Sequence, residues 1–492
     1  MAANLPALQV VVPLMAAPLC VLLRRPGLVW GFATLTCWAA FAISIALLVR
    51  VGEVGAISYE LGGWAVPWGI EYRVDTVNVF VLLIVSGIAA LTLPYARASV
   101  AAEVPRDKHA LFYTMVLLAV TGLLGIAITG DAFNLFVFLE ISSLSSYALI
   151  GMGRDRRALT AAYQYLIMGT IGATFILIGV GFLYMVTGTL NMGDLGERLA
   201  PLSGSGTVQA AFAFLTVGIG LKLAMFPLHL WLPNAYAFAP SAVTVLLAAT
   251  ATKVAVYMLL RFAFTVFGVS FAFAEMRVGA VLLPLAVIAM FAASVVAIFQ
   301  DDIKRMLAYS SVAQVGYMLL GIGFATTLGL TGGIVHLFNH ALMKAALFMC
   351  LGAVFLRHGS VHSDALRGLG ARMPLTSAAL VVAGLSLIGI PGTVGFVSKL
   401  YLVRAALETG WWPLAVLVLL SSLLAVVYVW RIVEIAYLRE PAAAPAGRGE
   451  APAGMLVPIL LLAAACVYFG LDTGLPVGVA TRAAETLLGG AP

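Results

Sequence analysis

The sequence predicts an all-α polytopic membrane protein with about 14 transmembrane helices, including two inverted five-helix repeats that contain broken helices. Three observations predict this fold. The chain is 63% hydrophobic and 10% charged, whereas soluble domains are near 45–50% apolar and about 25% charged. Apolar runs follow one another along almost the whole chain, and two distant stretches align with each other. No polar segment is long enough to fold as a separate soluble domain.

Fourteen apolar runs reach the length of roughly 20 residues that a bilayer-spanning helix needs. The predicted spans are 6–23, 28–49, 76–96, 109–129, 132–152, 160–187, 207–228, 241–267, 279–299, 305–325, 327–356, 375–404, 412–437 and 454–471. Between the second and third spans, the glycine, proline and tryptophan residues of 59–68 predict a short hairpin at the membrane surface.

The repeat is visible as an alignment of residues 133–151 with residues 303–321 at a shift of 170, which pairs Tyr147 with Tyr317. The two copies lie five spans apart. Because five is odd, equivalent helices cross the membrane in opposite directions, as in many transporters. We therefore divide the chain into N-terminal spans with the hairpin, a first repeat, a second repeat, and a linker with the last span and a tail: 1–108, 109–268, 269–440 and 441–492.

Basic residues gather on one side of the predicted membrane. They are Arg24, Arg25, Arg97, Arg106, Lys108, Arg154, Arg156, Arg157, Lys304, Arg305, Arg357, Arg367, Arg372, Arg439 and Arg448. The positive-inside rule places this side in the cytoplasm, so both termini are expected outside the cell membrane. The net charge of +6 therefore indicates membrane orientation, not nucleic-acid binding. The four cysteines lie in apolar runs and are expected to be buried hydrophobes.

Some charged residues are expected to have surface roles only. Residues 301–305 carry two aspartates, Lys304 and Arg305, and are predicted to form a solvated loop. Arg431 and Glu434 are predicted to form an ion pair at a helix end.

The strongest functional signal is a lysine beside two prolines. Lys222 lies deep in the span 207–228, and Pro227 and Pro233 follow it. Proline removes a backbone donor and clashes with the preceding turn, so the helix is predicted to break here; Pro391 predicts a second break in the span 375–404. Broken helices within a bilayer occur where the freed backbone lines a buried or wet cavity, and a lysine there indicates an ion pathway.

Five ionisable side chains fall inside predicted spans: Glu140, Lys222, Lys253, Lys344 and Lys399. On insertion scales a central charge costs about 2.5–3.5 kcal/mol, so neutral drift would not readily leave five in place. A buried lysine can release its proton near neutral pH, whereas arginine cannot. This choice of residue favours proton transfer, with Glu140 as the partner of Lys222. A structural ion pair or a cap on a broken helix is the alternative for each lysine.

His336, His340 and Lys344 follow at intervals of four residues and share one face of a helix. Imidazoles and water can relay protons, because histidine titrates near working pH. The alternative is a zinc site, since two histidines four residues apart can bind zinc. We expect no metal, because neither a carboxylate nor a cysteine is near in sequence. His229 is as well suited to satisfy freed backbone groups as to carry protons.

At these residues the sequence resembles the antiporter-like, proton-translocating membrane subunits of Mrp-type cation/proton antiporters, respiratory complex I and membrane-bound hydrogenases. Within this family it is most similar to the D-type Mrp subunits. The resemblance covers nearly the whole chain and is most specific in Phe138-Leu-Glu-Ile-Ser-Ser-Leu-Ser-Ser-Tyr147, Lys222 to Pro240, Ala251-Thr-Lys-Val-Ala-Val-Tyr257 and Gly395-Phe-Val-Ser-Lys-Leu-Tyr401.

The resemblance implies a role for each matching residue. Glu140 would tune Lys222, Lys253 would link two half-channels, and Lys399 would serve the outer half-channel, while His336 and His340 match polar positions between them. Lysine at 399 favours the D-type or N-type subunit over the M-type.

The expected function is proton translocation within a multisubunit Na+/H+ antiporter; the alternative is the proton-pumping membrane arm of a complex I-like NADH:quinone oxidoreductase or a membrane-bound hydrogenase. The expected partners are the other membrane subunits of such a complex, with protons and, in an antiporter, Na+ as the transported ions. The sequence contains neither a glycine-rich nucleotide motif nor a cysteine cluster, so no cofactor is expected.

Overall fold

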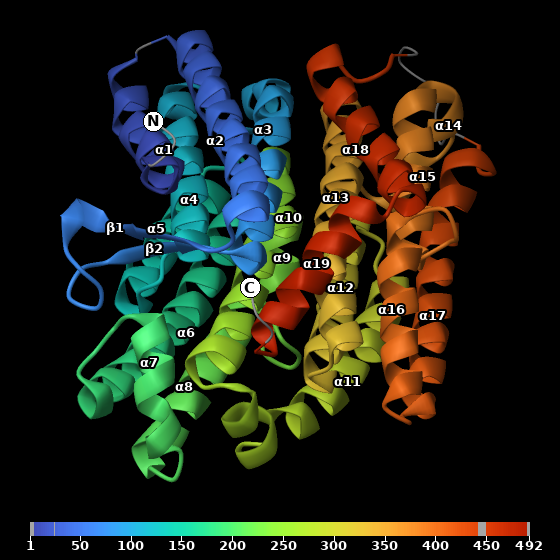
Figure 1. The fold of residues 1–492 in the computed structure, drawn as a ribbon. Coiled ribbons are helices and arrows are strands. Elements are labelled where there is room, and N and C mark those ends of the chain that lie inside the picture. Colours follow the sequence, from blue (N-terminus) through green and yellow to red (C-terminus); the bar gives the residue numbers. More distant parts are fainter. Residues whose placement is uncertain (1–3, 24, 441–448, 490–492) are drawn as a thin grey trace.

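The computed structural model describes residues 4–23, 25–440 and 449–489, and these are almost entirely helical (Figure 1). The N-terminal part comprises α1 (Leu5–Leu22), α2 (Pro26–Val54), β1 (Ile57–Glu60), β2 (Glu71–Val74) and α3 (Thr76–Glu103). The two strands pair antiparallel, with Ile57 opposite Val74, so the predicted hairpin forms. Asp75 follows the hairpin and caps α3 by accepting hydrogen bonds from the amides of Val77 and Asn78.

Two successions of helices follow, with the same order of long and short elements. The first comprises α4 (His109–Ile128), α5 (Ala132–Gly151), α6 (Arg157–Thr187), α7 (Met192–Leu199), α8 (Gly206–Lys222), α9 (Trp231–Phe238) and α10 (Ser241–Leu260). The second comprises α11 (Val278–Ile298), α12 (Ile303–Phe324), α13 (Thr327–His358), α14 (Leu369–Arg372), α15 (Pro374–Ile388), α16 (Val394–Glu408) and α17 (Trp412–Tyr437). The chain continues with α18 (Ala453–Leu471) and α19 (Gly474–Leu487).

The two successions also share a local contact. Asp131 forms an isolated antiparallel bridge with Asn191, and Asp302 forms one with His362. Asp302 lies 171 residues after Asp131, and His362 lies 171 residues after Asn191. This separation is close to the shift of 170 that aligns the two repeats in the sequence. Asp131 and Asp302 also cap α5 and α12 in the same way, through a backbone amide three residues later. The same order, spacing and caps support a duplicated architecture.

Twelve helices among the described residues are long and apolar enough to cross a membrane, and the chain is a multi-pass membrane protein. Of the two remaining predicted spans, 207–228 contains α8 and an irregular stretch that leads to α9, and 375–404 is divided into α15 and most of α16. The short helices α7 and α19 were not predicted. The predicted linker at 441–452 lies largely outside the described residues.

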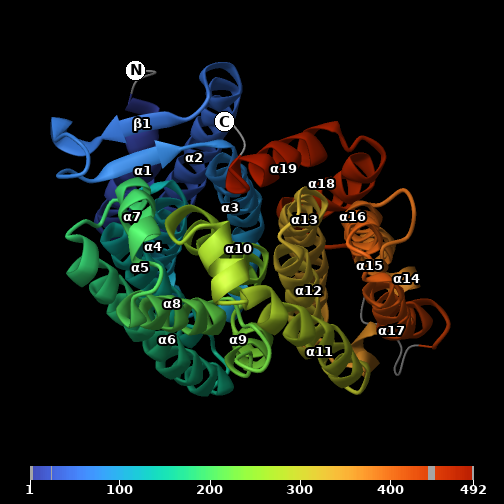
Figure 2. The ribbon, with the colours of Figure 1, turned by 60° about the horizontal axis from the view of Figure 1, so that its bottom comes forward.

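The two successions stand side by side, and α3, α10 and α13 pack together where they meet (Figure 1). Helix α13 is buried along its most apolar window, although it carries His336, His340 and Lys344. Helix α19 lies across one face and packs on both α3 and α13 (Figure 2). Lys253 of α10 and these three side chains of α13 are therefore shielded by protein on all sides.

Two expectations about surface charge were wrong. Arg431 pairs with Asp301 at 2.6 Å, and Glu434 pairs with Arg439 at 2.8 Å, so the two do not pair with each other. Lys304 is buried and does not lie in a solvated loop, because α12 begins at Ile303 and carries it into the protein.

Candidate functional site

Lys222 is the last residue of α8, and the chain then runs without regular helix to the start of α9 at Trp231. Pro227 lies in this irregular stretch. Pro233 lies in the first turn of α9, where a missing N–H group costs no hydrogen bond. The second broken span is similar, with Pro391 between the end of α15 and the start of α16.

The ammonium of Lys222 is held by polar groups of α5. Its Nζ donates to Ser143 Oγ at 2.9 Å and to Tyr147 OH at 3.4 Å. Glu140 Oε1 lies 4.0 Å from Nζ and has no hydrogen-bond partner among the described residues. Lys222 is buried, whereas the Glu140 side chain remains 29% exposed. Among the lysines of the described chain, Lys222 is the one with a carboxylate within 4.0 Å.

A small cavity lies between Lys222 and α10. Its volume is about 20 Å³, and its polar lining consists of Lys222, Ser142, Ser143, Ser146 and Tyr165. Roughly 10–15 Å³ is enough for one water molecule, and hydroxyl groups can hydrogen-bond it. The opposite wall is the face of α10 that includes Ala251 and Val254, on either side of Lys253. A water here would lie beside Lys222, whereas Lys253 does not line this cavity.

Lys253 is completely buried in the middle of α10. Its Nζ donates to the carbonyl oxygen of Ala248 and lies 3.3 Å from Thr252 Oγ1. These oxygens are neutral, so the lysine is solvated by its own helix and has no counterion among the described carboxylates within 4.0 Å. Helix α10 packs against α13, which brings Lys253 to the side of the molecule that carries the histidines.

The polar residues of α13 form a row on one face. His336 has a partner at each ring nitrogen, Ser398 Oγ at 2.8 Å and Gln314 Oε1 at 2.9 Å. The ring of His340 stacks on that of His336 with centroids 5.9 Å apart, and neither nitrogen of His340 has a partner among the described residues. Lys344 Nζ donates to the carbonyl oxygen of Leu307 at 2.7 Å and to Ser310 Oγ.

Lys399 lies at the second break. Its Nζ donates to the carbonyl oxygens of Ile388 at 2.7 Å and Leu387 at 3.2 Å, the last residues of α15. The C-terminal carbonyls of a helix carry partial negative charge and lack helical partners, which favours an ammonium there. The ammonium also lies 4.8 Å from the ring centre of Tyr317. Ser398, next to Lys399, contacts His336, so this lysine and the histidine row are adjacent.

The structure brings the predicted residues together in two groups. Glu140 and Lys222 are together at the first break, and His336, His340, Lys344 and Lys399 are together around α13. No group of three or more His, Cys, Asp or Glu residues able to hold a metal is found in the described parts of the chain. His229 stacks on Phe226 at the first break.

Sequence reasoning missed the groups that hold these side chains. Ser143, Gln314 and Ser398 contact the predicted site residues directly. The sequence offered only weak signals for them: Ser143 and Ser398 lie within four residues of a predicted site residue, and Gln314 lies in the aligned repeat. The burial of Lys304 was also missed, because its neighbours in the sequence are charged.

Comparisons with known proteins identify the family of the chain. The family described as NADH:quinone oxidoreductase/Mrp antiporter, TM, matches residues 129–425. The N-type subunit of the NADH-quinone oxidoreductase of Desulforudis audaxviator is 44% identical, over 96% of this chain and 96% of its own. The D-type subunit of the Na+/H+ antiporter of Bacillus subtilis is 30% identical, over 99% and 97%.

A solved structure is similar over the same length. A chain of the Mrp complex from Dietzia sp. DQ12-45-1b matches with a TM-score of 0.89 and 27% identity, covering 99% of this chain and 98% of that one. Because the family match covers more than half of the sequence and the relatives align from end to end, the chain belongs to the NADH:quinone oxidoreductase/Mrp antiporter transmembrane family.

Proposed function

We propose that the chain is a proton-translocating subunit of a multisubunit Na+/H+ antiporter in the cell membrane, with both termini outside. The observation that carries this proposal is the pair at the first break, where the buried Lys222 Nζ lies 4.0 Å from Oε1 of the partly exposed Glu140. Nearby opposite charge favours the charged lysine, and separation of the two favours release of its proton. Such a pair can therefore couple a small movement to proton transfer.

The proposed path runs along the middle of the membrane. Protons enter at Glu140 and Lys222, pass Lys253, and continue along the polar face of α13 to Lys399. His336 and His340 are suited to the middle of this path, because a neutral imidazole can accept a proton at one nitrogen and donate from the other. The unpaired nitrogens of His340 leave it free to bind water that would connect it to its neighbours.

The second candidate is a membrane-arm subunit of a quinone-reducing or hydrogenase complex, in which distant redox chemistry drives the same proton path. The 44% identity to a protein named as the N-type subunit of an NADH-quinone oxidoreductase favours it. The partners that co-purify with the native complex separate the two candidates: small antiporter-type membrane subunits support the first, and flavin, iron–sulfur or nickel subunits support the second.

Both candidate functions require proton translocation through this chain, and transport by the complex carrying Lys222→Ala tests it. We expect proton movement in membrane vesicles to be lost while the amount of assembled complex, measured by co-purification of its partners, is unchanged. Undiminished proton movement by the assembled variant would remove Lys222 from the path and with it the proposed function.

A further inference from the structure

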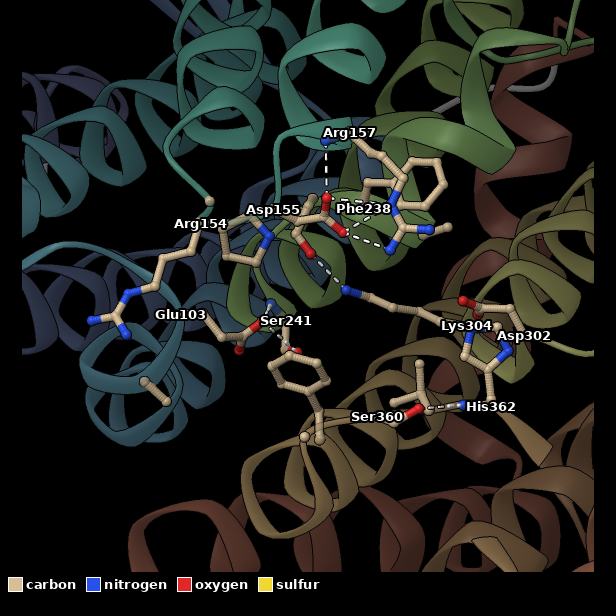
Figure 3. Close-up of a pocket in the computed structure, with 18 residues that line it drawn as sticks. Glu103, Arg154, Asp155, Arg157, Phe238, Ser241, Asp302, Lys304, Ser360 and His362 are labelled. Atoms are coloured by element: carbon tan, nitrogen blue, oxygen red, sulfur yellow. Dashed lines mark hydrogen bonds and ion pairs between the residues drawn. The ribbon is translucent and has the colours of Figure 1, made fainter. Parts of the chain in front are cut away.

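A cavity of about 220 Å³ opens at the membrane face where the two successions of helices meet (Figure 3). It lies between the end of α3, the loop before α6, the junction of α9 and α10, the start of α12 and the loop after α13. The arginine distribution assigns this face to the cytoplasm. Liquid water occupies about 30 Å³ per molecule, so the cavity has room for roughly seven waters.

Lys304 reaches into the centre of this cavity (Figure 3). Its Nζ donates to the carbonyl oxygen of Ala239 at 2.6 Å. Ala239 follows α9, so the contact joins the second succession to the broken helix of the first. The other charged and titratable groups that line the cavity are Glu103, Arg154, Asp155, Arg157, Asp302 and His362.

The first turns of α12 hold a second ammonium deeper in the protein. Lys344 donates to the carbonyl oxygen of Leu307 and to Ser310 Oγ, three and six residues beyond Lys304. At a rise of 1.5 Å per residue these acceptors lie roughly 5 to 9 Å deeper along the helix axis. Lys344 is completely buried, whereas Lys304 lines the cavity. One lysine thus contacts the aqueous side and the other belongs to the mid-membrane row.

We propose that this cavity is an aqueous mouth of the proton path and that Lys304 is a further proton-transfer residue, which exchanges protons between the cavity and Lys344. The inference rests on the proposed function and adds a branch that reaches the path at α13, away from Lys222. Glu103 lines the same cavity and accepts hydrogen bonds from the backbone and hydroxyl of Ser241, which fixes a carboxylate at the mouth.

The transfer conserves protons at each step. The Lys304 ammonium passes a proton inward, through a bridging water, to the Ser310 hydroxyl, which donates its own proton to a neutral Lys344 amine. The Lys304 amine then takes a proton from the cavity and recovers its charge. A serine hydroxyl is both donor and acceptor, so it can connect two lysines that do not touch. Only an amine that can lose its proton can serve at position 304.

Two substitutions separate this role from a structural one. Arginine at 304 keeps the charge and can still donate to Ala239, but it does not release its proton. Methionine keeps a chain of similar length and removes the charge. If Lys304 only ties α12 to α9, Lys304→Arg retains transport; if it transfers protons, Lys304→Arg and Lys304→Met both lower proton movement at least tenfold in assembled complex. Transport by either variant at the wild-type rate overturns the proposal.

The controls are chosen within the same chain. Lys108 is exposed at the same predicted face, and Lys108→Met is expected to stay within twofold of wild type. Lys222→Ala is measured in the same vesicles. If Lys222→Ala also leaves proton movement intact, the proposed function has failed; if it abolishes movement while the Lys304 variants are normal, only the present inference has failed.

Access to the cavity provides a second test that does not depend on the Lys304 variants. Ser360 lines the cavity, and the four native cysteines are buried, so Ser360→Cys offers a single accessible thiol. A charged, membrane-impermeant thiol reagent is expected to modify it from one side of the vesicle membrane only and to slow proton movement at least fivefold. A thiol that stays unmodified from both sides, or full modification without slower transport, overturns the proposal.

Discussion

Trp231 donates its indole N–H to the carbonyl oxygen of Leu221 at 2.9 Å, across the break between α8 and α9. Leu221 is next to Lys222, and at the interrupted helix its carbonyl keeps a long backbone hydrogen bond, from the amide of Ala224 at 3.3 Å. The indole also stacks on Tyr165, with ring centres 3.9 Å apart and planes within 4°. Tyr165 in turn meets Tyr147, a neighbour of the Lys222 ammonium. The indole therefore helps to position Lys222, through the carbonyl of Leu221 and through the stacked tyrosines.

Trp231→Phe is expected to lower both stability and transport. Phenylalanine keeps an aromatic ring against Tyr165 but leaves the Leu221 carbonyl with the long hydrogen bond from Ala224. Loss of one hydrogen bond costs about 0.5–1.5 kcal/mol. Thermal unfolding of the detergent-purified complex should show this loss, and proton movement should fall with it. Trp412→Phe, at an exposed tryptophan, should change neither quantity; an equal effect there would show that the hydrogen bond is not the cause.

A substitution at Gly389 tests whether the second break positions Lys399 for proton transfer. It follows α15 with a φ of 92°, and a Cβ atom there would lie 3.0 Å from Lys399 Cδ. Gly389→Ala therefore adds a left-handed backbone cost of about 1–2 kcal/mol and pushes the stem of the lysine. We expect proton movement to fall about tenfold, since small misplacements of a reacting group have large effects.

Gly392→Ala is the matched control for this change. Its φ is 84°, so it carries a similar backbone cost, but the nearest atom to its Cβ would be Leu471 Cδ2 at 3.9 Å. Both variants should lose similar stability, measured by thermal unfolding, and Gly389→Ala alone should lose transport. Equal transport by the two would mean that the position of Lys399 does not limit the rate.

Glu140→Gln tests the pair at the first break. Two unit charges 4 Å apart interact by about 4 kcal/mol at an effective dielectric constant of about 20. A third of that interaction already corresponds to a tenfold change in rate. We expect proton movement to fall about tenfold or more in Glu140→Gln and to recover in part in Glu140→Asp, which keeps the charge. Equal losses in the two variants would contradict a role for the carboxylate charge.

The sequence was most informative where burial is costly. Charged groups in apolar runs are rare, so Lys222, Lys253, Lys344 and Lys399 were evident without a structure, and Pro227 marked the break. The sequence could not show which neutral oxygens solvate each ammonium. Those contacts come from helices far apart in the chain, and serine or backbone carbonyl acceptors are too common to stand out in a sequence.

Elements with weak or misleading local signals were missed. Helix α7 contains two glycines, which are poor helix formers, but Asn191 caps it and Arg198 pairs with Asp194 one turn away. Helix α19 is too polar for a span, and its packing on α3 and α13 stabilises it. Lys304 follows two aspartates, so the local charge indicated solvent, and only the packing of α12 against the junction of α9 and α10 buries it.

Asp75 supports a prediction about pH. Its Oδ1 lies 2.5 Å from Arg261 Nη2, and both side chains are buried. Burial disfavours the carboxylate, but the charge and hydrogen bond of Arg261 outweigh burial and hold the pKa of Asp75 below its usual value. The stabilisation is complete above about pH 4, the pKa of an unfolded aspartate, and is lost as the pH falls through the lower, folded pKa.

Asp75→Asn is expected to reduce the free energy of unfolding by roughly 3 kcal/mol at neutral pH, because it leaves Arg261 buried without a counterion. Below about pH 4 the carboxylate of the unfolded wild-type chain takes up a proton, and the folded one follows at its lower pKa, so the difference between the two proteins should shrink. Asp194→Asn is the control, since its pair with Arg198 is at the surface and should contribute less than about 1 kcal/mol. A difference between wild type and Asp75→Asn that stays constant from pH 7 to pH 3 would show that asparagine disturbs the cap of α3, not the charge pair.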